Sequence, residues 1–194
     1  MGGKLFDYSA AMYYRLLSSI ERCRLNVRIF ISSLFKAYLC KKSKSLLQQQ
    51  PHGRKKENKI LLKTGIVFEG KSTIVAPFYY EFGKISIGKN LYINSGCTFL
   101  DNAPINIGDN TLIGPNVNIC TVTHVVNPCD RHINVIKPIW IGNNVWIGAG
   151  TVILPGVSIG DNSVIGANSV VNCDVPPNVL YAGSPAKLIK QLVS

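Results

Sequence analysis

Apolar residues recur with two different periods along the chain, and the period changes near residue 60. From about Leu5 to Leu39 they stand three and four residues apart, the spacing of one face of an α-helix, and we expect two helices there. A basic, Gln-rich stretch from Lys41 to Lys59 follows, which favours a loop or linker. The pattern therefore predicts a helical region with its linker over 1–59 and a second domain over 60–194.

The second domain repeats a six-residue unit. An aliphatic residue followed by Gly, any residue and Asn occurs six times, first at Ile87. Every sixth position in this region is apolar and branched or aromatic, as the inner wall of a pleated structure requires. The predicted inward positions are Ile87, Ile93, Phe99, Ile107, Ile113, Ile119, Ile141, Ile147, Ile153, Ile159, Ile165 and Val171.

Each unit fits one short strand and one tight turn, because Gly and Asn tolerate turn conformations that β-branched residues resist. Three units make one coil, and coils must stack to bury their inner faces, so the fold class is a mainly β solenoid of parallel strands. The spacing breaks twice, between Phe99 and Ile107 and between Ile119 and Ile141. The second break leaves extra chain around 120–138 and predicts a protruding loop.

Positive charge is concentrated in the first third of the chain. The net charge is +11, whereas residues 64–194 hold equal numbers of basic and acidic residues. The cysteines show no metal or disulfide spacing, which indicates free thiols in a reducing compartment. Asp7 and Arg15 interrupt the apolar core that a secretory signal needs, and no stretch is long enough to span a membrane. We expect a cytoplasmic protein.

The run GNNVWIGAGTVILPGVSIGDNSVIGANSVV and the later DVPPNVLYAGSPAKLIK resemble the maltose and galactoside O-acetyltransferases, which are hexapeptide-repeat acyltransferases. The resemblance extends from about residue 60 to 190, and it includes the coupling of NNVWIG to an upstream TVTH. It implies a left-handed parallel β-helix, a homotrimer with active sites between subunits, and direct transfer from acetyl-CoA to a sugar or glycan hydroxyl. The left hand follows from the resemblance alone, since crossover connections are generally right-handed.

The resemblance implies that His124, which ends the TVTH motif, is the catalytic general base. An imidazole with a pKa near neutrality can take the proton of a sugar hydroxyl during attack on a thioester. Tyr92 and Asn94 match a Tyr-x-Asn that lines the family's sugar site, and amide groups suit polyol recognition. Asp101 resembles the first member of an acidic pair and is a third acceptor-binding candidate. The second acid is Asn102 in this chain, which leaves sugar selectivity open.

Four residues are candidates for binding acetyl-CoA, the co-substrate. The resemblance places Trp146 close to the catalytic histidine, and Ala149 and Ala167 along the pantetheine arm. The backbone N–H of Ala149 is the candidate donor to the developing oxyanion. Lys187 stands where the family often has Arg near the phosphates, and a lysine can act there as a point charge. A further family cation is replaced by Cys173.

Other functions stay open at this point. A non-catalytic solenoid scaffold would use the basic N-terminal helices on a membrane surface or a polyanion. A metal-dependent hydratase would need three histidines at coil spacing, which His52, His124 and His132 do not provide, so we expect no metal. An antibiotic or an envelope glycan could replace a simple sugar as acceptor. For the homotrimer we expect Trp140 and Val145 on outward faces.

Overall fold

The computed structural model describes residues 34, 38, 41 and 64–193. The chain divides into two compact units, Met1–Cys40 and Lys41–Ser194. The two predicted N-terminal helices and the linker lie outside the described residues, apart from three single positions, so the boundary near residue 60 stays a prediction. Among the described residues, no helix is long and apolar enough to cross a membrane.

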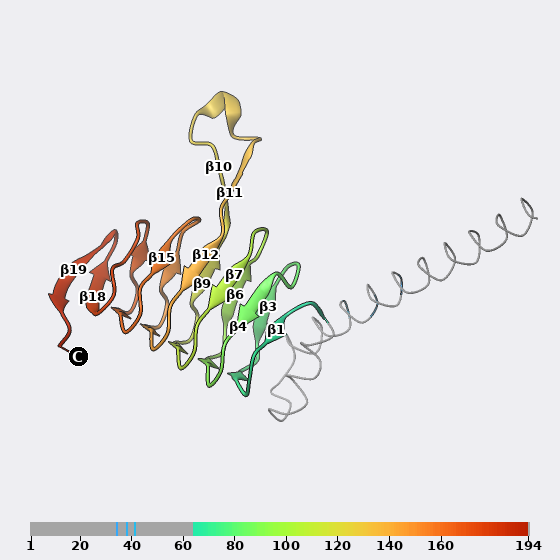
Figure 1. Cartoon of the computed structure of the whole chain (residues 1–194). Helices are drawn as coiled ribbons and strands as arrows, with labels where there is room; N and C mark the ends of the chain where they lie inside the picture. Colours follow the sequence, from blue (N-terminus) through green and yellow to red (C-terminus); the bar gives the residue numbers. More distant parts are fainter. Residues whose placement is uncertain (1–33, 35–37, 39–40, 42–63, 194) are drawn as a thin grey trace, which may run out of the picture. The chain divides into compact units, whose positions relative to one another are not determined.

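Residues 64–193 of the second unit form a parallel β-solenoid of about six turns with three faces (Figure 1). The chain passes from sheet A to sheet B to sheet C in each turn. Sheet A contains β1 (Val67–Phe68), β4 (Ile85–Ile87), β7 (Ile105–Ile107), β12 (Ile139–Ile141) and β15 (Ser158–Ile159). Sheet B contains β2 (Thr73–Ile74), β5 (Tyr92–Ile93), β8 (Leu112–Ile113), β13 (Trp146–Ile147), β16 (Val164–Ile165), β18 (Val179–Gly183) and β19 (Ala186–Gln191). Sheet C contains β3 (Phe78–Tyr80), β6 (Cys97–Leu100), β9 (Asn118–Cys120), β14 (Val152–Ile153) and β17 (Val170–Val171).

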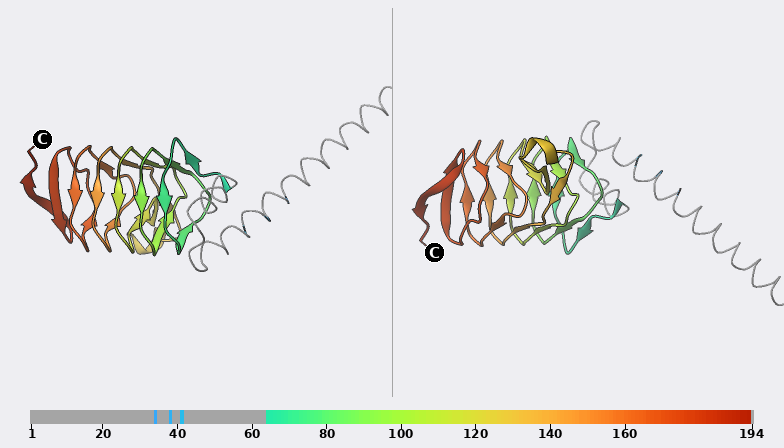
Figure 2. Two further views of the ribbon diagram at one scale, coloured as in Figure 1. Left: turned by 90° about the horizontal axis from the view of Figure 1, so that it is seen from below. Right: turned by 90° about the horizontal axis from the view of Figure 1, so that it is seen from above.

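The repeat forms these turns as the sequence predicts. All twelve predicted inward residues are buried. The strands of successive coils stack in register along the three faces (Figure 2), so these residues follow one another from coil to coil inside the solenoid. The Asn that closes each repeat has a positive φ, from Asn144 at 53° to Asn162 at 59°. Asn is one of the few residues other than Gly that adopts this left-handed conformation at low cost. The period of six is therefore set by one strand and one left-handed turn residue.

A second inward column corrects one expectation. Val145 was expected on an outward face, but it is buried, with 1% of its surface exposed. In a strand, residues two apart point to the same side, so Val145 and Ile147 both face the interior while Trp146 faces outward. Counting every sixth residue identifies only one of the two inward positions in each strand. Trp140 does lie on an outward face, with 49% exposed.

The predicted loop at 120–138 is a β-hairpin that projects from the corner between sheets C and A (Figure 1). It consists of β10 (Val122–His124), a 3-10 helix at Pro128–Asp130 and β11 (Asn134–Ile136), and the two strands are antiparallel. Buried Thr121 anchors its base, because its hydroxyl donates to the Leu100 carbonyl at 2.7 Å and accepts from the Ala103 N–H at 2.9 Å. At the other end of the solenoid, β18 and β19 form an antiparallel pair.

Candidate active site

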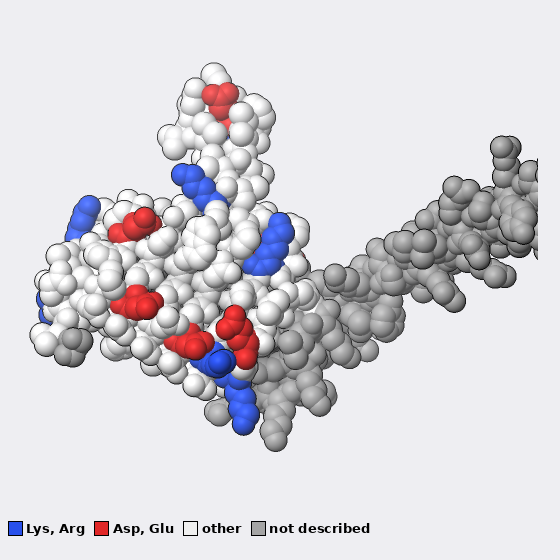
Figure 3. All heavy atoms as spheres, viewed as in Figure 1, with Lys and Arg blue, Asp and Glu red and all other residues white. Residues whose placement is uncertain are grey.

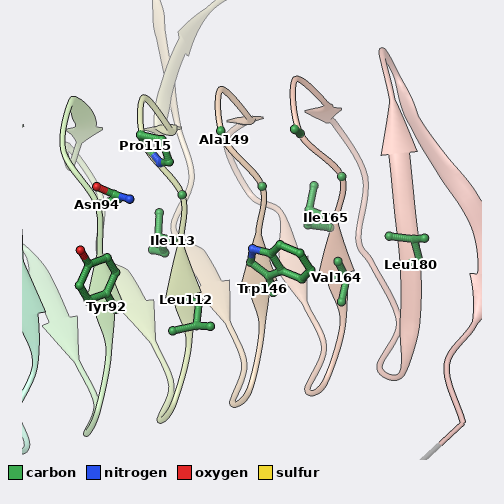
Figure 4. Close-up of a pocket in the computed structure, with 14 residues that line it drawn as sticks. Tyr92, Asn94, Leu112, Ile113, Pro115, Trp146, Ala149, Val164, Ile165 and Leu180 are labelled. Carbon is green, nitrogen blue, oxygen red and sulfur yellow. The ribbon is translucent and has the colours of Figure 1, made fainter.

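The outer surface of sheet B is an apolar ladder that crosses five strands. Tyr92, Leu112, Trp146, Val164 and Leu180 pair in register on consecutive strands, and each points away from the solenoid interior (Figure 4). The alternation of the strand fixes this direction, because the residue that follows each of the first four is buried in the core. The ladder forms the floor of a groove of about 630 Å³.

Small residues form one side of this groove, at the turns between sheets B and C. Pro115, Ala149 and Ala167 occupy equivalent places in three consecutive coils and line the groove (Figure 4). The coils stack tightly here: a Cβ added to Gly148 would lie 2.5 Å from the backbone nitrogen of Ala167. The backbone of this turn row is therefore open to a molecule in the groove.

In the turns on the opposite side of sheet B, between sheets A and B, the backbone N–H of the residue after Gly is satisfied by a side chain. There, a side chain of the next coil caps three successive N–H groups: Lys89 N–H donates to Asp109 at 2.7 Å, Asp109 N–H donates to Asn143 at 2.8 Å, and Asn143 N–H donates to Asp161 at 2.8 Å. This ladder of carboxylates and amides satisfies donors that the strands leave over.

The turns that border the groove lack this ladder. Ser95 N–H donates to Asn94 Oδ1 at 2.8 Å, and Pro115 has no N–H. The N–H groups of Ala149 and Ala167 donate to no atom of the described part of the chain, since the residues opposite them in the next coil, Ala167 and Gly183, have no side-chain acceptor. The groove therefore offers two free backbone donors beside an apolar floor, an arrangement suited to a long ligand with amide or thioester carbonyls.

Asn94 and Tyr92 lie at one end of the groove (Figure 4). The Oδ1 of Asn94 is occupied by the Ser95 N–H, so its amide NH₂ is the group that can reach a ligand. Tyr92 is 37% exposed, and it pairs in register with Leu112 of the neighbouring strand.

His124 does not line this groove. It ends β10 in the projecting hairpin, opposite Asn134, and it is exposed. The hairpin leaves the corner between sheets C and A (Figure 1), whereas the residues that line the groove belong to sheet B and the turns after it. Within a single chain, His124 and Trp146 therefore lie on different parts of the solenoid, although the resemblance places them close together in the active site.

Asp101 has a structural environment. It is fully buried, outside the groove lining, and its carboxylate accepts backbone N–H groups of the preceding coil from Glu81 at 2.6 Å, Phe82 at 3.0 Å and Lys84 at 2.7 Å. It is the cap of the turn between sheets C and A. The Oδ1 of the next residue, Asn102, is buried and has no hydrogen-bond partner within the described ranges.

Lys187 is exposed on β19, where it pairs with Ala182. Ala182 is adjacent to the groove coil, since a Cβ added to Gly166 would lie 2.7 Å from the Ala182 Cβ. Lys187 is outside the groove lining, which contains no Lys or Arg. It is placed to meet only the far end of a ligand that extends beyond the coil.

Comparison with known proteins agrees with this geometry. The family model described as bacterial transferase hexapeptide (six repeats) matches residues 138–173. Galactoside O-acetyltransferase of Escherichia coli K12 is 42% identical over 158 residues, which cover 78% of this chain and 78% of that protein. The structure of a hexapeptide-repeat acetyltransferase from Vibrio cholerae, complexed with acetyl-CoA, superposes with a TM-score of 0.76 at 38% identity over 81% of this chain and 87% of that one.

This chain is a hexapeptide-repeat acetyltransferase. Sophorolipid acetyltransferase of Starmerella bombicola is 50% identical over 122 residues, and these cover 61% of this chain but only 47% of that protein. The chain thus spans about half the length of this relative.

Within this acetyltransferase, five sequence-predicted residues share one groove: Tyr92, Asn94, Trp146, Ala149 and Ala167. His124, Asp101 and Lys187 lie elsewhere in the chain. Among the described residues, no three His, Cys, Asp or Glu side chains are grouped as metal ligands. The resemblance implied that small residues at Ala149 and Ala167 let backbone amides reach a ligand, but it did not show which N–H groups are free of partners within the chain. A comparison of the residues that follow Gly in successive repeats carries a signal for this: in the capped turns the next coil has Asp or Asn at that position, and in the groove turns it does not.

Proposed function

We propose that this acetyltransferase moves the acetyl group of acetyl-CoA to a hydroxyl of a sugar or glycan, in a ternary complex, with His124 as the general base. The site lies between two chains of a homotrimer: one supplies the groove on sheet B and its neighbour supplies the hairpin with His124. The observation that supports this most is the pair of N–H groups of Ala149 and Ala167, free among the described residues, beside an apolar floor in a groove that His124 of the same chain does not line.

Acetyl-CoA suits this groove chemically. Its pantetheine arm has two amide carbonyls that can accept the free N–H groups, and its methylenes can cover Trp146 and Leu112. Its phosphates need positive charge, which the lining lacks and Lys187 would supply. Because a single lysine gives no bidentate contact, we expect CoA phosphates to be held by charge alone at this end.

The reaction needs one proton to be moved twice. His124 Nε2 or Nδ1 takes the proton as the acceptor oxygen attacks the thioester carbon, and the N–H of Ala149 stabilises the oxyanion that forms. The carbon–sulfur bond then breaks, and the imidazolium returns the proton to the CoA sulfur. The Asn94 amide and the Tyr92 hydroxyl position the acceptor, whereas the structure gives Asp101 a folding role that would reach the acceptor only indirectly.

Three further features complete the proposal. The solenoid is a left-handed β-helix, as in the family that the sequence resembles. The domain over 60–194 is catalytic, with a basic N-terminal region over 1–59 that contacts a membrane surface at most peripherally. The protein works in the cytoplasm, where its described cysteines, all free, stay reduced.

The test is His124→Ala, with His132→Ala in the same hairpin as matched control. Loss of a general base lowers turnover by about 10² to 10⁴, or roughly 3 to 5 kcal/mol of barrier. Turnover should be measured with a panel of mono- and oligosaccharides by chromatography of the acetylated product. A thiol reagent for the released CoA is unsuitable, because it would also react with exposed Cys129 and Cys173. The KM for acetyl-CoA should stay unchanged in both variants. A folded His124→Ala protein with near-normal turnover would refute the assignment.

A further inference from the structure

A second groove lies on sheet A, on a different face from the acetyl-CoA groove. It has a volume of about 480 Å³, and its central side chain is Trp140. Trp140 is 49% exposed on β12, and in register it lies between Asn106 of β7 and Ser158 of β15. An exposed aromatic ring lacks the favourable free energy of burial, and a ligand or partner that covers the Trp140 ring would gain that free energy on binding.

The neighbours of Trp140 are hydrogen-bonding groups rather than other apolar residues. Asn106, Ser86 and Glu69 line the groove, and their side chains form no hydrogen bond with any residue in 64–193. Asn106 pairs with Trp140 on one side and with Ser86 on the other, so an amide and a hydroxyl extend outward beside the ring. This contrasts with the acetyl-CoA groove, where the ring of Trp146 lies between Leu112 and Val164.

The charge of this groove selects against anions. Glu69 and Asp109 line it, and no Lys or Arg does. Elsewhere on the face of the solenoid that Figure 3 shows, acidic and basic side chains are interspersed, so the acidic character belongs to the groove lining itself. One Asp109 oxygen already accepts the Lys89 N–H, and Asn143 is held by Asp161, so both keep fixed positions with further acceptor capacity outward. A phosphate or a uronic acid would meet repulsion here, whereas hydroxyl groups would find acceptors.

We propose that this surface, the Trp140 groove, binds a neutral saccharide unit. The C–H face of a pyranose ring packs on the Trp140 indole, and its hydroxyls donate to Glu69 and Asp109 and exchange hydrogen bonds with Asn106 and Ser86. The inference goes beyond the proposed reaction, because it concerns a binding site on sheet A that holds no reacting group. It would let the enzyme hold an oligosaccharide at a distance from the hydroxyl that is acetylated.

The first measurement uses fluorescence. The chain has two tryptophans, so Trp146→Phe leaves Trp140 as the single reporter. Titration with neutral gluco-, galacto- and manno-oligosaccharides of several units should give a saturable change in Trp140 emission with at least one of them. Acidic galacturonate oligomers should give none. If no neutral oligosaccharide changes the emission, or if the acidic ones bind as well, the proposal is wrong.

The second measurement separates this groove from the acceptor site, in the otherwise unaltered chain. Calorimetric titration with the oligosaccharide identified above should show at least a tenfold weaker affinity for Trp140→Ala, and an intermediate one for Trp140→Phe, which keeps a stacking ring. Ser158→Ala, whose side chain is next to Trp140 but outside the groove lining, is the matched control and should bind normally. Light scattering must accompany these titrations. If Trp140→Ala dissociates the assembly, sheet A is a subunit contact and the proposal fails.

Discussion

Asp101→Ala should destabilise the fold because it removes one acceptor from three backbone donors at once. Asp101 is fully buried and accepts the N–H groups of Glu81, Phe82 and Lys84. A hydrogen bond to a charged group contributes about 1.5 to 3 kcal/mol, although some of this is lost to the desolvation of the carboxylate. Phe82 and Lys84 are exposed residues whose N–H groups can turn to water once the carboxylate is gone. The expected net loss is therefore about 3 to 5 kcal/mol rather than the full sum.

The assay is urea unfolding at one fixed protein concentration, because assembly stabilises the folded chain by mass action. Asp101→Asn keeps one acceptor oxygen but turns an NH₂ group toward a donor, so it should lose about half as much. Asp109→Ala is the matched control, since that carboxylate caps a single N–H, from Lys89 at 2.7 Å, near the surface. It should cost about 1 kcal/mol or less.

The contrary outcome is equally specific. If Asp101→Ala unfolds at the same urea concentration as the unaltered chain but raises the KM of the acceptor, then Asp101 is an acceptor-binding residue, as the family resemblance alone implies. The backbone contacts of its carboxylate would then contribute nothing measurable to folding.

Two further predictions concern Lys187 and Cys97. Lys187→Ala should raise the KM for acetyl-CoA by about two- to tenfold and leave kcat unchanged, because a charge on the phosphates stabilises ground and transition states alike; initial rates at varied acetyl-CoA would show an unchanged KM if another group holds the phosphates. Burial raises the pKa of the Cys97 thiol from 9.0 to about 11, so the thiol ionises at a lower pH in the unfolded chain than in the folded one. The free energy of unfolding therefore keeps its full value below pH 9 and falls as the pH rises from 9 to 11. At 1.36 kcal/mol per unit this loss approaches about 3 kcal/mol, and thermal unfolding of Cys97→Ser should lack it. Equal pH slopes for both proteins would contradict the burial argument.

The repeat made the solenoid predictable, because its signal is local. Each Asn with positive φ and each inward Ile lies within a few residues of the turn that it shapes, so Ile113 and Asn116 could be placed without knowing the rest of the chain. The projecting hairpin followed from a simple excess of residues between Ile119 and Ile141. Its β10–β11 pairing and the antiparallel β18–β19 pair did not follow, because neither has the six-residue pattern.

The site was only partly predictable, since its parts depend on contacts between coils. Asp101 lies seventeen to twenty residues from its donors, and no local pattern links it to the backbone of Lys84 or Glu81. For the same reason the resemblance could place small residues at Ala149 and Ala167 but could not show that the Ala167 N–H has no partner, because that depends on the residue opposite it in the next coil. Trp140 could be placed on an outward face, but its groove depends on Asn106 and Glu69 from two other coils.

The central claim is that His124 and the groove of one active site belong to different chains, and mixing two inactive variants tests it most directly. His124→Ala keeps an intact groove, and Ala149→Phe fills the groove while keeping His124. Each variant alone should form inactive trimers. Unfolding and refolding an equal mixture should restore about a quarter of the unaltered activity, because one interface in four then joins an intact hairpin to an intact groove. Trimers of mixed composition that remain inactive would contradict the shared site, since a site within one chain cannot be rescued by a neighbour.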